Sequence, residues 1–229
     1  MSNVDRLLTE SDDPHLKAVL ALCRSLVPGF EVVFKDESAL MKFLNFFAQL
    51  FNKKFMTHYT TTIDRTVYFP SRANVMMQQS MYAEILAHEL VHMTDRQREG
   101  ALPYFFRYAF PQVLSVLSLL SVLAFWNPWF LLCLLFLVFL APLPSPGRRD
   151  IELDGYEMSL AVIYWRQGEL GDGYFEWIAD KFVSSDYYFM WPWGAEIVHE
   201  LKLRAQRFRT GEVLKRAIYR QVHAIFAKK

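Results

Sequence analysis

The sequence predicts an α+β fold that is mostly helical, has a small N-terminal sheet and is interrupted by an apolar helical hairpin. Three observations predict it: apolar residues recur at helical spacing along most of the chain, strand-type runs are confined to residues 30–69, and residues 108–147 contain no Asp, Glu, Lys or Arg. With 229 residues, the chain suits one domain with a sizeable insertion. The expected parts are residues 1–107, the hydrophobic hairpin over 108–147, and residues 148–229.

Apolar spacing and the residues that begin and end each run predict the individual elements. A helix over 15–26 follows two capping candidates, Asp12 and Asp13, and stops at Pro28-Gly29. Runs rich in Thr, Tyr, Val and Phe predict a strand at 30–34 and a β-hairpin formed by 59–63 and 66–69. Further helices are expected over 37–51, 74–96, 151–165 and 175–182, and two amphipathic helices close the chain with a break near Thr210-Gly211.

Composition excludes several classes of protein. The 25 Lys and Arg against 24 Asp and Glu leave a net charge of +1, which argues against a dedicated nucleic-acid-binding protein. A hydrophobic content of 53% excludes a disordered chain. The two cysteines, Cys23 and Cys133, cannot form a disulfide framework, so nothing indicates an oxidising compartment.

The uncharged segment divides at Asn127-Pro128, which is a turn signal. As α-helices, the arms 109–126 and 129–143 would reach about 27 Å and about 22 Å. Both are short for a bilayer core of about 30 Å, although aromatic residues at both ends and local thinning can compensate. These aromatic residues are Tyr104, Phe105, Phe106, Tyr108, Trp126 and Trp129.

We interpret the segment as a two-helix membrane span. A re-entrant or monotopic hairpin, and a hairpin buried in a soluble fold or an oligomer, are the alternatives. Arginines flank the segment at Arg107 and Arg148 whereas the turn has none, so the remaining parts should face the cytoplasm. Because a hairpin returns the chain to the side it left, residues before and after it can build one site.

The stretch His88-Glu89-Leu90-Val91-His92 lies within the expected helix over 74–96. Two histidines four residues apart project from one helical face, so both imidazoles can bind the same ion. Glu89 then lies beside the open position of the metal, where it can accept a proton from water. A pair of hydrogen-bonded core histidines is the structural alternative.

A hydrolytic zinc site needs a third protein ligand. We favour Glu152, which follows the hairpin and precedes Gly155 by three residues, because a helical glycine there lets the histidine helix pack closely. The alternatives are Asp154, Glu157 and Glu176.

The motif with a downstream Glu resembles the gluzincin group of zinc metallopeptidases, and the layout is similar to HtpX-like membrane peptidases and to soluble minigluzincins. The resemblance implies a zincin-like catalytic domain, Zn²⁺ held by His88, His92 and Glu152, and Glu89 as the catalytic base. It also implies that the strand over 66–69 presents an edge to an extended peptide. The family spelling Glu-x-x-Ala-Asp occurs at Glu176–Asp180 and not at Glu152, which leaves the third ligand open.

Secondary roles follow from position. Tyr156 is the preferred candidate for stabilising an oxyanion, ahead of Tyr82 and His58. Asp95 is a candidate for orienting a ligand imidazole, or for a cap or surface role. Residues 195–229 contain nine Lys and Arg against three Glu, which suits either helices on anionic lipid or ordinary solvated faces.

The expected function is a membrane-anchored zinc metalloendopeptidase that acts on a protein or peptide substrate and contacts the lipid bilayer, with no nucleic acid. A non-catalytic membrane protein with a structural metal site, and a soluble zincin whose hairpin is an oligomer interface, are the alternatives. Substrate identity and oligomeric state stay open.

Overall fold

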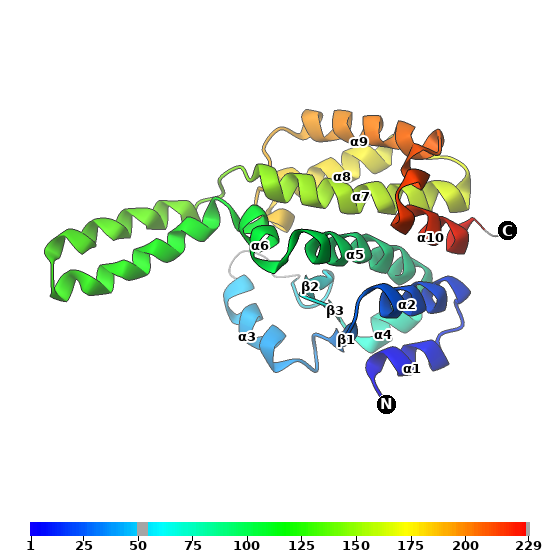
Figure 1. Ribbon diagram of the computed structural model, residues 1–229, viewed down its shortest axis with the longest axis horizontal. Coiled ribbons are helices and arrows are strands. Elements are labelled where there is room, and N and C mark those ends of the chain that lie inside the picture. Colours follow the sequence, from blue (N-terminus) through cyan, green and yellow to red (C-terminus); the bar gives the residue numbers. More distant parts are fainter. Residues whose placement is uncertain (50–54, 228–229) are drawn as a thin grey trace.

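The computed structural model describes residues 1–49 and 55–227, and in these residues the chain is mostly helical with a small three-stranded sheet. The α+β class predicted from the sequence is therefore confirmed. Helices α7, α8 and α9 lie on one side of the central helix α5, the sheet and the N-terminal helices lie on its other side, and the hairpin projects from one end (Figure 1). The helices of the globular body are α1 Asn3–Glu10, α2 Pro14–Leu26, α3 Ala39–Ala48, α4 Arg72–Met77, α5 Gln79–Glu99, α6 Ala101–Ala109, α7 Pro146–Gln167, α8 Gly173–Val183, α9 Gly194–Arg209 and α10 Ala217–Phe226.

Strand β3 (Thr66–Phe69) is the central strand of the sheet. It pairs in parallel with β1 (Glu31–Phe34), with Val32 opposite Val67, and antiparallel with β2 (Thr61–Ile63). The expectation that the strand over 66–69 presents a free edge is wrong, because both of its sides are hydrogen-bonded. The edge strand next to the candidate site is β2.

The long helix expected over 74–96 is broken at Gln78, whose backbone (φ −131°, ψ 41°) leaves the helical region. The following residue, Gln79, explains the break. Its side-chain oxygen accepts hydrogen bonds from the Ser11 hydroxyl and from the backbone N–H groups of Asp12 and Asp13. This tertiary contact fixes the start of α5 against the α1–α2 loop.

Most other element boundaries agree with the expectations within a few residues. Of the two capping candidates, Asp13 caps α2. Helix α1 was not expected, although Ser2 and Asp5 form a capping box at its start. The last two residues of the helix expected over 37–51 lie outside the described residues.

The hairpin arms are 3-10 helices, η1 (Gln112–Phe125) and η2 (Pro128–Leu140), and not the α-helices we expected. A burial pattern with a period of three accompanies this geometry, because a 3-10 helix has three residues per turn. The small or polar residues 112, 115, 118, 121 and 124 are shielded on η1, and Phe130, Cys133, Phe136 and Phe139 are shielded on η2. Small side chains on one arm thus face larger ones on the other.

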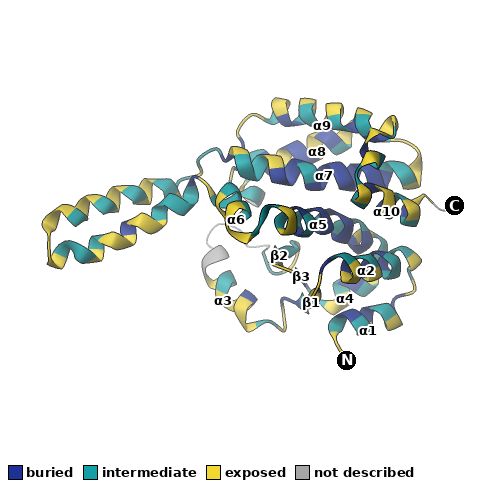
Figure 2. Cartoon of the chain, in the orientation of Figure 1, coloured by how far each residue is buried: buried dark blue, intermediate teal, exposed yellow. Residues whose placement is uncertain are grey.

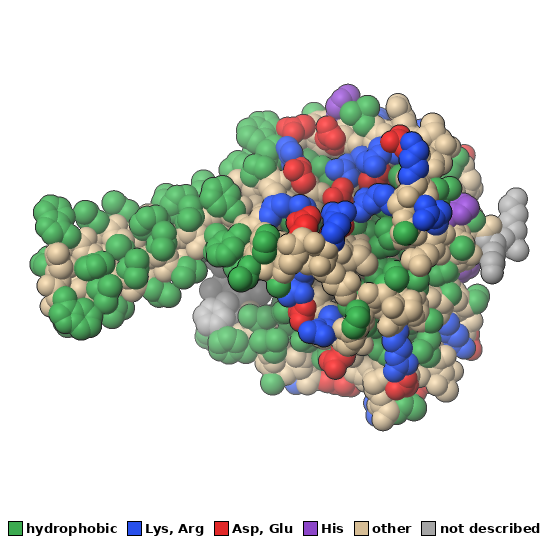
Figure 3. Space-filling model, viewed as in Figure 1, with side chains coloured by type: hydrophobic (Ala, Val, Ile, Leu, Met, Phe, Trp, Pro, Cys, Tyr) green, Lys and Arg blue, Asp and Glu red, His purple; other side chains and the backbone are tan. Residues whose placement is uncertain are grey.

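The outer surface of the hairpin is apolar and exposed. Phe125 is 94% exposed and Leu135 is 71% exposed. Figure 2 shows exposed and intermediate residues along both arms, and Figure 3 shows hydrophobic side chains on the arms where the body carries charges. Among the described residues, no single helix is long and apolar enough to cross a bilayer. Helices α6 and η1 pass that test only together, and they meet at a bend of 94°.

The segments before and after the hairpin share one hydrophobic core. Helix α5 packs against α2 on one side and α7 on the other, and α10 packs against both α2 and α7. Buried residues such as Leu86 and Leu90 of α5 belong to the same cluster as Met158 and Leu160 of α7. This packing brings α5 and α7 together at the site described next.

Candidate metal centre

His88 and His92 lie one turn apart on α5 and point to the same place. Their Nε2 atoms are 3.0 Å apart, and their ring centroids are separated by 4.7 Å. His88 is 7% exposed, so the pair sits at the boundary of the core. The spacing of four residues produces this convergence because it nearly matches one helical turn.

Glu152 of α7 completes the group. Its Oε2 atom is 3.8 Å from Nε2 of His88 and 3.9 Å from Nε2 of His92, and the three side chains could hold a metal ion. Ligand atoms about 2.0–2.1 Å from a tetrahedral ion are roughly 3.3 Å apart. The observed separations bracket that value, so the donor set fits a single ion after small side-chain adjustments.

The other three acids considered from the sequence are engaged elsewhere or remote. Asp154 forms an ion pair with Arg204, and the fully buried Glu157 pairs with Arg204 and Arg207. Glu176 is exposed in the first turn of α8. Of these four described acids, Glu152 is the one that lies beside both imidazoles.

Gly155 allows α7 to approach α5 closely. A Cβ atom added at this position would lie 2.5 Å from Nε2 and 2.6 Å from Cε1 of His88. A real Cβ could not occupy that position without moving the imidazole. The space expected from the glycine three residues after Glu152 is therefore present.

Neighbouring groups orient the donors. The Ser159 hydroxyl lies 3.2 Å from Nδ1 of His88, so an N–H at Nδ1 can donate to it while Nε2 faces the group. The Tyr108 hydroxyl donates to Oε1 of Glu152 at 3.1 Å. Asp95 instead pairs with Arg98 and Arg216 and is not hydrogen-bonded to either imidazole in the described structure.

The surroundings shift the ionisation of two acids in opposite directions. Burial opposes ionisation of Glu152, but the His88 and His92 rings and the Arg148 charge prevail and lower its pKa to about 2. Burial raises the pKa of Glu89 despite the nearby His92. Burial and the neighbouring His88 lower the pKa of His92, which favours the neutral imidazole that binds metals.

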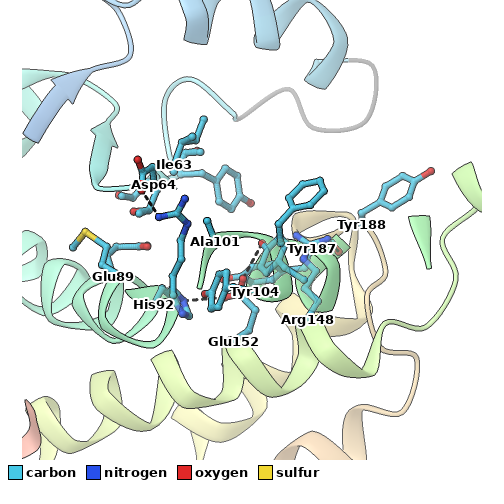
Figure 4. Close-up of a pocket in the computed structure, with 18 of the residues that line it drawn as sticks. Ile63, Asp64, Glu89, His92, Ala101, Tyr104, Arg148, Glu152, Tyr187 and Tyr188 are labelled. Carbon is cyan, nitrogen blue, oxygen red and sulfur yellow. Dashed lines mark hydrogen bonds and ion pairs between the residues drawn. The ribbon is translucent and has the colours of Figure 1, made fainter. Parts of the chain in front are cut away.

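A cavity of about 800 Å³ opens beside the group, and Glu89, His92 and Glu152 line it. Strand β2 and its turn form one wall, and residues of α6, of the first turn of α7 and of η3 (Ser185–Tyr187) form the opposite wall. Figure 4 shows Ile63 and Asp64 on the first side, and Arg148, Tyr187 and Tyr188 on the other. The volume lies within the range of pockets that bind drug-sized ligands.

The candidates for oxyanion stabilisation lie outside this lining. The Tyr156 ring stands edge-on to His88 with centroids 4.9 Å apart, and its hydroxyl is 2.9 Å from that of Tyr187. Tyr82 is buried against Phe69, and His58 is exposed next to Thr57. Tyr156 thus packs against His88 and hydrogen-bonds through its hydroxyl to Tyr187, a residue of the cavity lining.

Sequence reasoning missed the residues that do line the wall near Glu152, which are Tyr104, Tyr108, Arg148 and Tyr187. Tyr104 and Tyr108 were considered only as interfacial aromatics and Arg148 only as a flanking charge. Their position at the two ends of the uncharged segment was the available signal, since a hairpin brings its ends together. The role of Tyr187 had no such signal.

Several basic residues of the C-terminal segment form ion pairs with acids of other helices. Arg204 and Arg207 of α9 pair with acids of α7, and Arg216 pairs with Asp95 of α5. These three cations therefore contribute to the packing of the last helices against α5 and α7.

No family model, no curated protein and no solved structure matches this chain. The geometry of the site is therefore the basis of the proposed function.

Proposed function

We propose that the protein is a membrane-anchored zinc metalloendopeptidase with a gluzincin-type, zincin-like catalytic domain. The convergence of Nε2 of His88, Nε2 of His92 and the Glu152 carboxylate, with Glu89 in the same cavity, is the observation that supports this function. Two imidazoles and one carboxylate suit Zn²⁺, and three protein ligands leave a position for water.

The residues of the site divide the tasks of peptide hydrolysis among them. When bound, the ion would lower the pKa of water and polarise the scissile carbonyl. Glu89 accepts the proton of the attacking water and returns it to the leaving amine. Ser159 and Tyr108 hold His88 and Glu152 in position for these steps.

A closed structural metal site is the less suitable alternative. Structural zinc sites have four protein ligands, whereas the group in the described residues contains three and adjoins a cavity of about 800 Å³. The space beside the group can accept a peptide segment, which a structural site does not need.

The hairpin is the segment that would anchor the protein in a membrane. With a rise of about 2.0 Å per residue, arms of 14 and 13 residues in the 3-10 form extend about 28 Å and about 26 Å, close to the bilayer core of about 30 Å. The 3-10 geometry therefore reduces the length deficit calculated for α-helices. Arg107 and Arg148 at its base favour a cytoplasmic catalytic part.

Replacing Glu89 with Gln tests the function. We expect the variant to bind zinc like the wild type and to lose peptide cleavage by at least about 100-fold, because only the proton acceptor is removed. Zinc is measured by elemental analysis, and cleavage is measured with a mixed peptide library. Retained cleavage would refute Glu89 as the base.

Two matched variants test the ligand assignment in the same assays. Glu152→Gln should lose both zinc and cleavage, whereas Glu176→Gln should lose neither because Glu176 is exposed on α8. The reverse pattern would assign the third ligand to Glu176.

A further inference from the structure

Arg148 is a cation in the cavity wall that forms no direct ion pair with a carboxylate in residues 1–49 and 55–227, although the charge of nearby Glu152 acts on it. It follows the hairpin in the first turn of α7 and lines the cavity together with Glu152. Its guanidinium lies 5.0 Å from the Tyr108 ring and 5.5 Å from the Tyr187 ring, measured to their centroids. Two aromatic rings therefore fix the position of the charge, and Figure 4 shows one of them, Tyr187, beside Arg148.

Part of the hydrogen-bonding capacity of this guanidinium is unused. It has five N–H donors. One of them, at Nη1, donates to the Tyr187 carbonyl at 3.3 Å and another reaches the Tyr108 side chain, while the buried Nε has no hydrogen-bond partner among the described residues. The planar donor face of an arginine matches the two oxygens of a carboxylate.

A second arginine in the cavity lining, Arg96, has a carboxylate partner. Arg96 of α5 also lines the cavity, but it forms an ion pair with Asp64 in the β2–β3 turn. With a divalent ion bound, the charges of Glu89 and Glu152 would balance the ion, and Arg96 and Asp64 would balance each other. Arg148 then remains as a positive charge, because Glu152, the carboxylate on which its charge acts, is neutralised by the ion.

We propose that Arg148 binds a carboxylate of the substrate, so the preferred substrate is a peptide that presents an acidic group beside the scissile bond. The inference rests on the proposed peptidase function and adds its substrate class. The carboxylate belongs either to an Asp or Glu side chain or to a free C-terminus, since the same donor face recognises both.

Binding of three acetylated hexapeptides to the full-length, zinc-loaded Glu89→Gln variant in detergent tests the proposal. One peptide contains Glu and ends in an amide, the second contains Gln and ends in an amide, and the third contains Gln and ends in a free carboxylate. We expect the first or the third to bind at least about tenfold more tightly than the second, as a charge-assisted hydrogen bond predicts. Which of the two is preferred identifies the source of the carboxylate.

Combined with Glu89→Gln, the Arg148→Gln substitution should abolish the preference for the peptide with a carboxylate and should leave the zinc content unchanged. The Arg148→Lys substitution should retain part of that preference. Arg96→Gln is the matched control and should leave the preference intact. A loss of binding that is equal for all three peptides, or a loss of zinc, would show that Arg148 only supports Glu152 and would overturn the proposal.

The two proposals fail in different ways. If acidic peptides bind through Arg148 but the wild type never cleaves them, the peptidase function is refuted and the carboxylate site is supported. Cleavage by the wild type, combined with equal binding of all three peptides or no binding, would overturn the carboxylate site and leave the peptidase function standing.

Discussion

Glu84 lies on α5, one turn before His88, and is shielded from solvent by the packing of that helix. Burial raises its pKa to about 7, although the charge of Arg166 on α7 opposes the shift. A carboxyl whose pKa is raised in the folded state favours folding in its protonated form. Its stabilising effect is complete below the unfolded-state value of about 4.5 and is lost as the pH rises toward 7.

Replacing Glu84 with Gln should therefore stabilise the protein at alkaline pH only. We expect a gain in unfolding free energy of about 1–2 kcal/mol at pH 8, discounted for partial exposure, and a gain near zero at pH 4.5. Urea unfolding of the detergent-solubilised chain at both pH values measures the gain in unfolding free energy. Glu169, an exposed acid beyond the end of α7, is the control. An equal gain at both pH values would contradict the assignment.

The distance between α5 and α7 depends on the absence of one side chain. Ser159 and Glu152 reach His88 because Gly155, between them on the same face of α7, has no Cβ. Glycine in a helix interior normally costs about 0.5–1 kcal/mol relative to alanine. The close approach of the two helices is the structural reason for this cost.

Gly155→Ala should consequently disturb the metal centre and not strengthen the helix. We expect zinc affinity to fall at least about tenfold and stability to fall by about 1–3 kcal/mol, because the new Cβ would overlap the His88 ring. Competition with a chelator measures the first and urea unfolding the second. Gly171→Ala, where a Cβ would meet no atom within 4 Å, is the control. Zinc affinity equal to that of the wild type would refute the packing argument.

In the whole molecule, the hairpin projects from a body whose hydrophobic core is continuous. Its two ends are joined at the base, where the Ser145 hydroxyl donates to the Phe110 carbonyl at 2.5 Å and the Gln112 amide donates to the Leu143 carbonyl at 3.0 Å. The core on either side of this base contains residues from both halves of the chain. The arms are therefore not needed to close the core.

Replacing residues 112–142 with a short Gly/Ser linker should separate anchoring from metal binding. We expect the shortened protein to remain in solution without detergent and to bind zinc within about twofold of the wild type, because Tyr108 and Arg148 are retained. Carbonate extraction and elemental analysis measure the two properties. Loss of zinc would show that the arms position Glu152, and carbonate extraction of the intact protein would argue against a membrane span.

Much of the fold could be predicted because local patterns determine it. Apolar spacing placed most helices, and runs of Thr, Tyr, Val and Phe placed all three strands. The break at Gln78 could not be predicted, since it depends on a contact between Gln79 and a loop more than 60 residues away. The order of the strands is also non-local, so the central position of β3 was missed.

The amino-acid sequence alone determined that His88 and His92 share a helical face and that an uncharged hairpin separates them from the acids that follow. Helical periodicity and the absence of charge are local properties, which the chain carries in any environment. Only the tertiary structure decided among the acids, because Asp154, Glu157 and Glu152 lie within two turns of α7 and have the same chemistry. Arginines of α9 pair with the first two, and the approach of α5 at Gly155 leaves Glu152 beside the imidazoles.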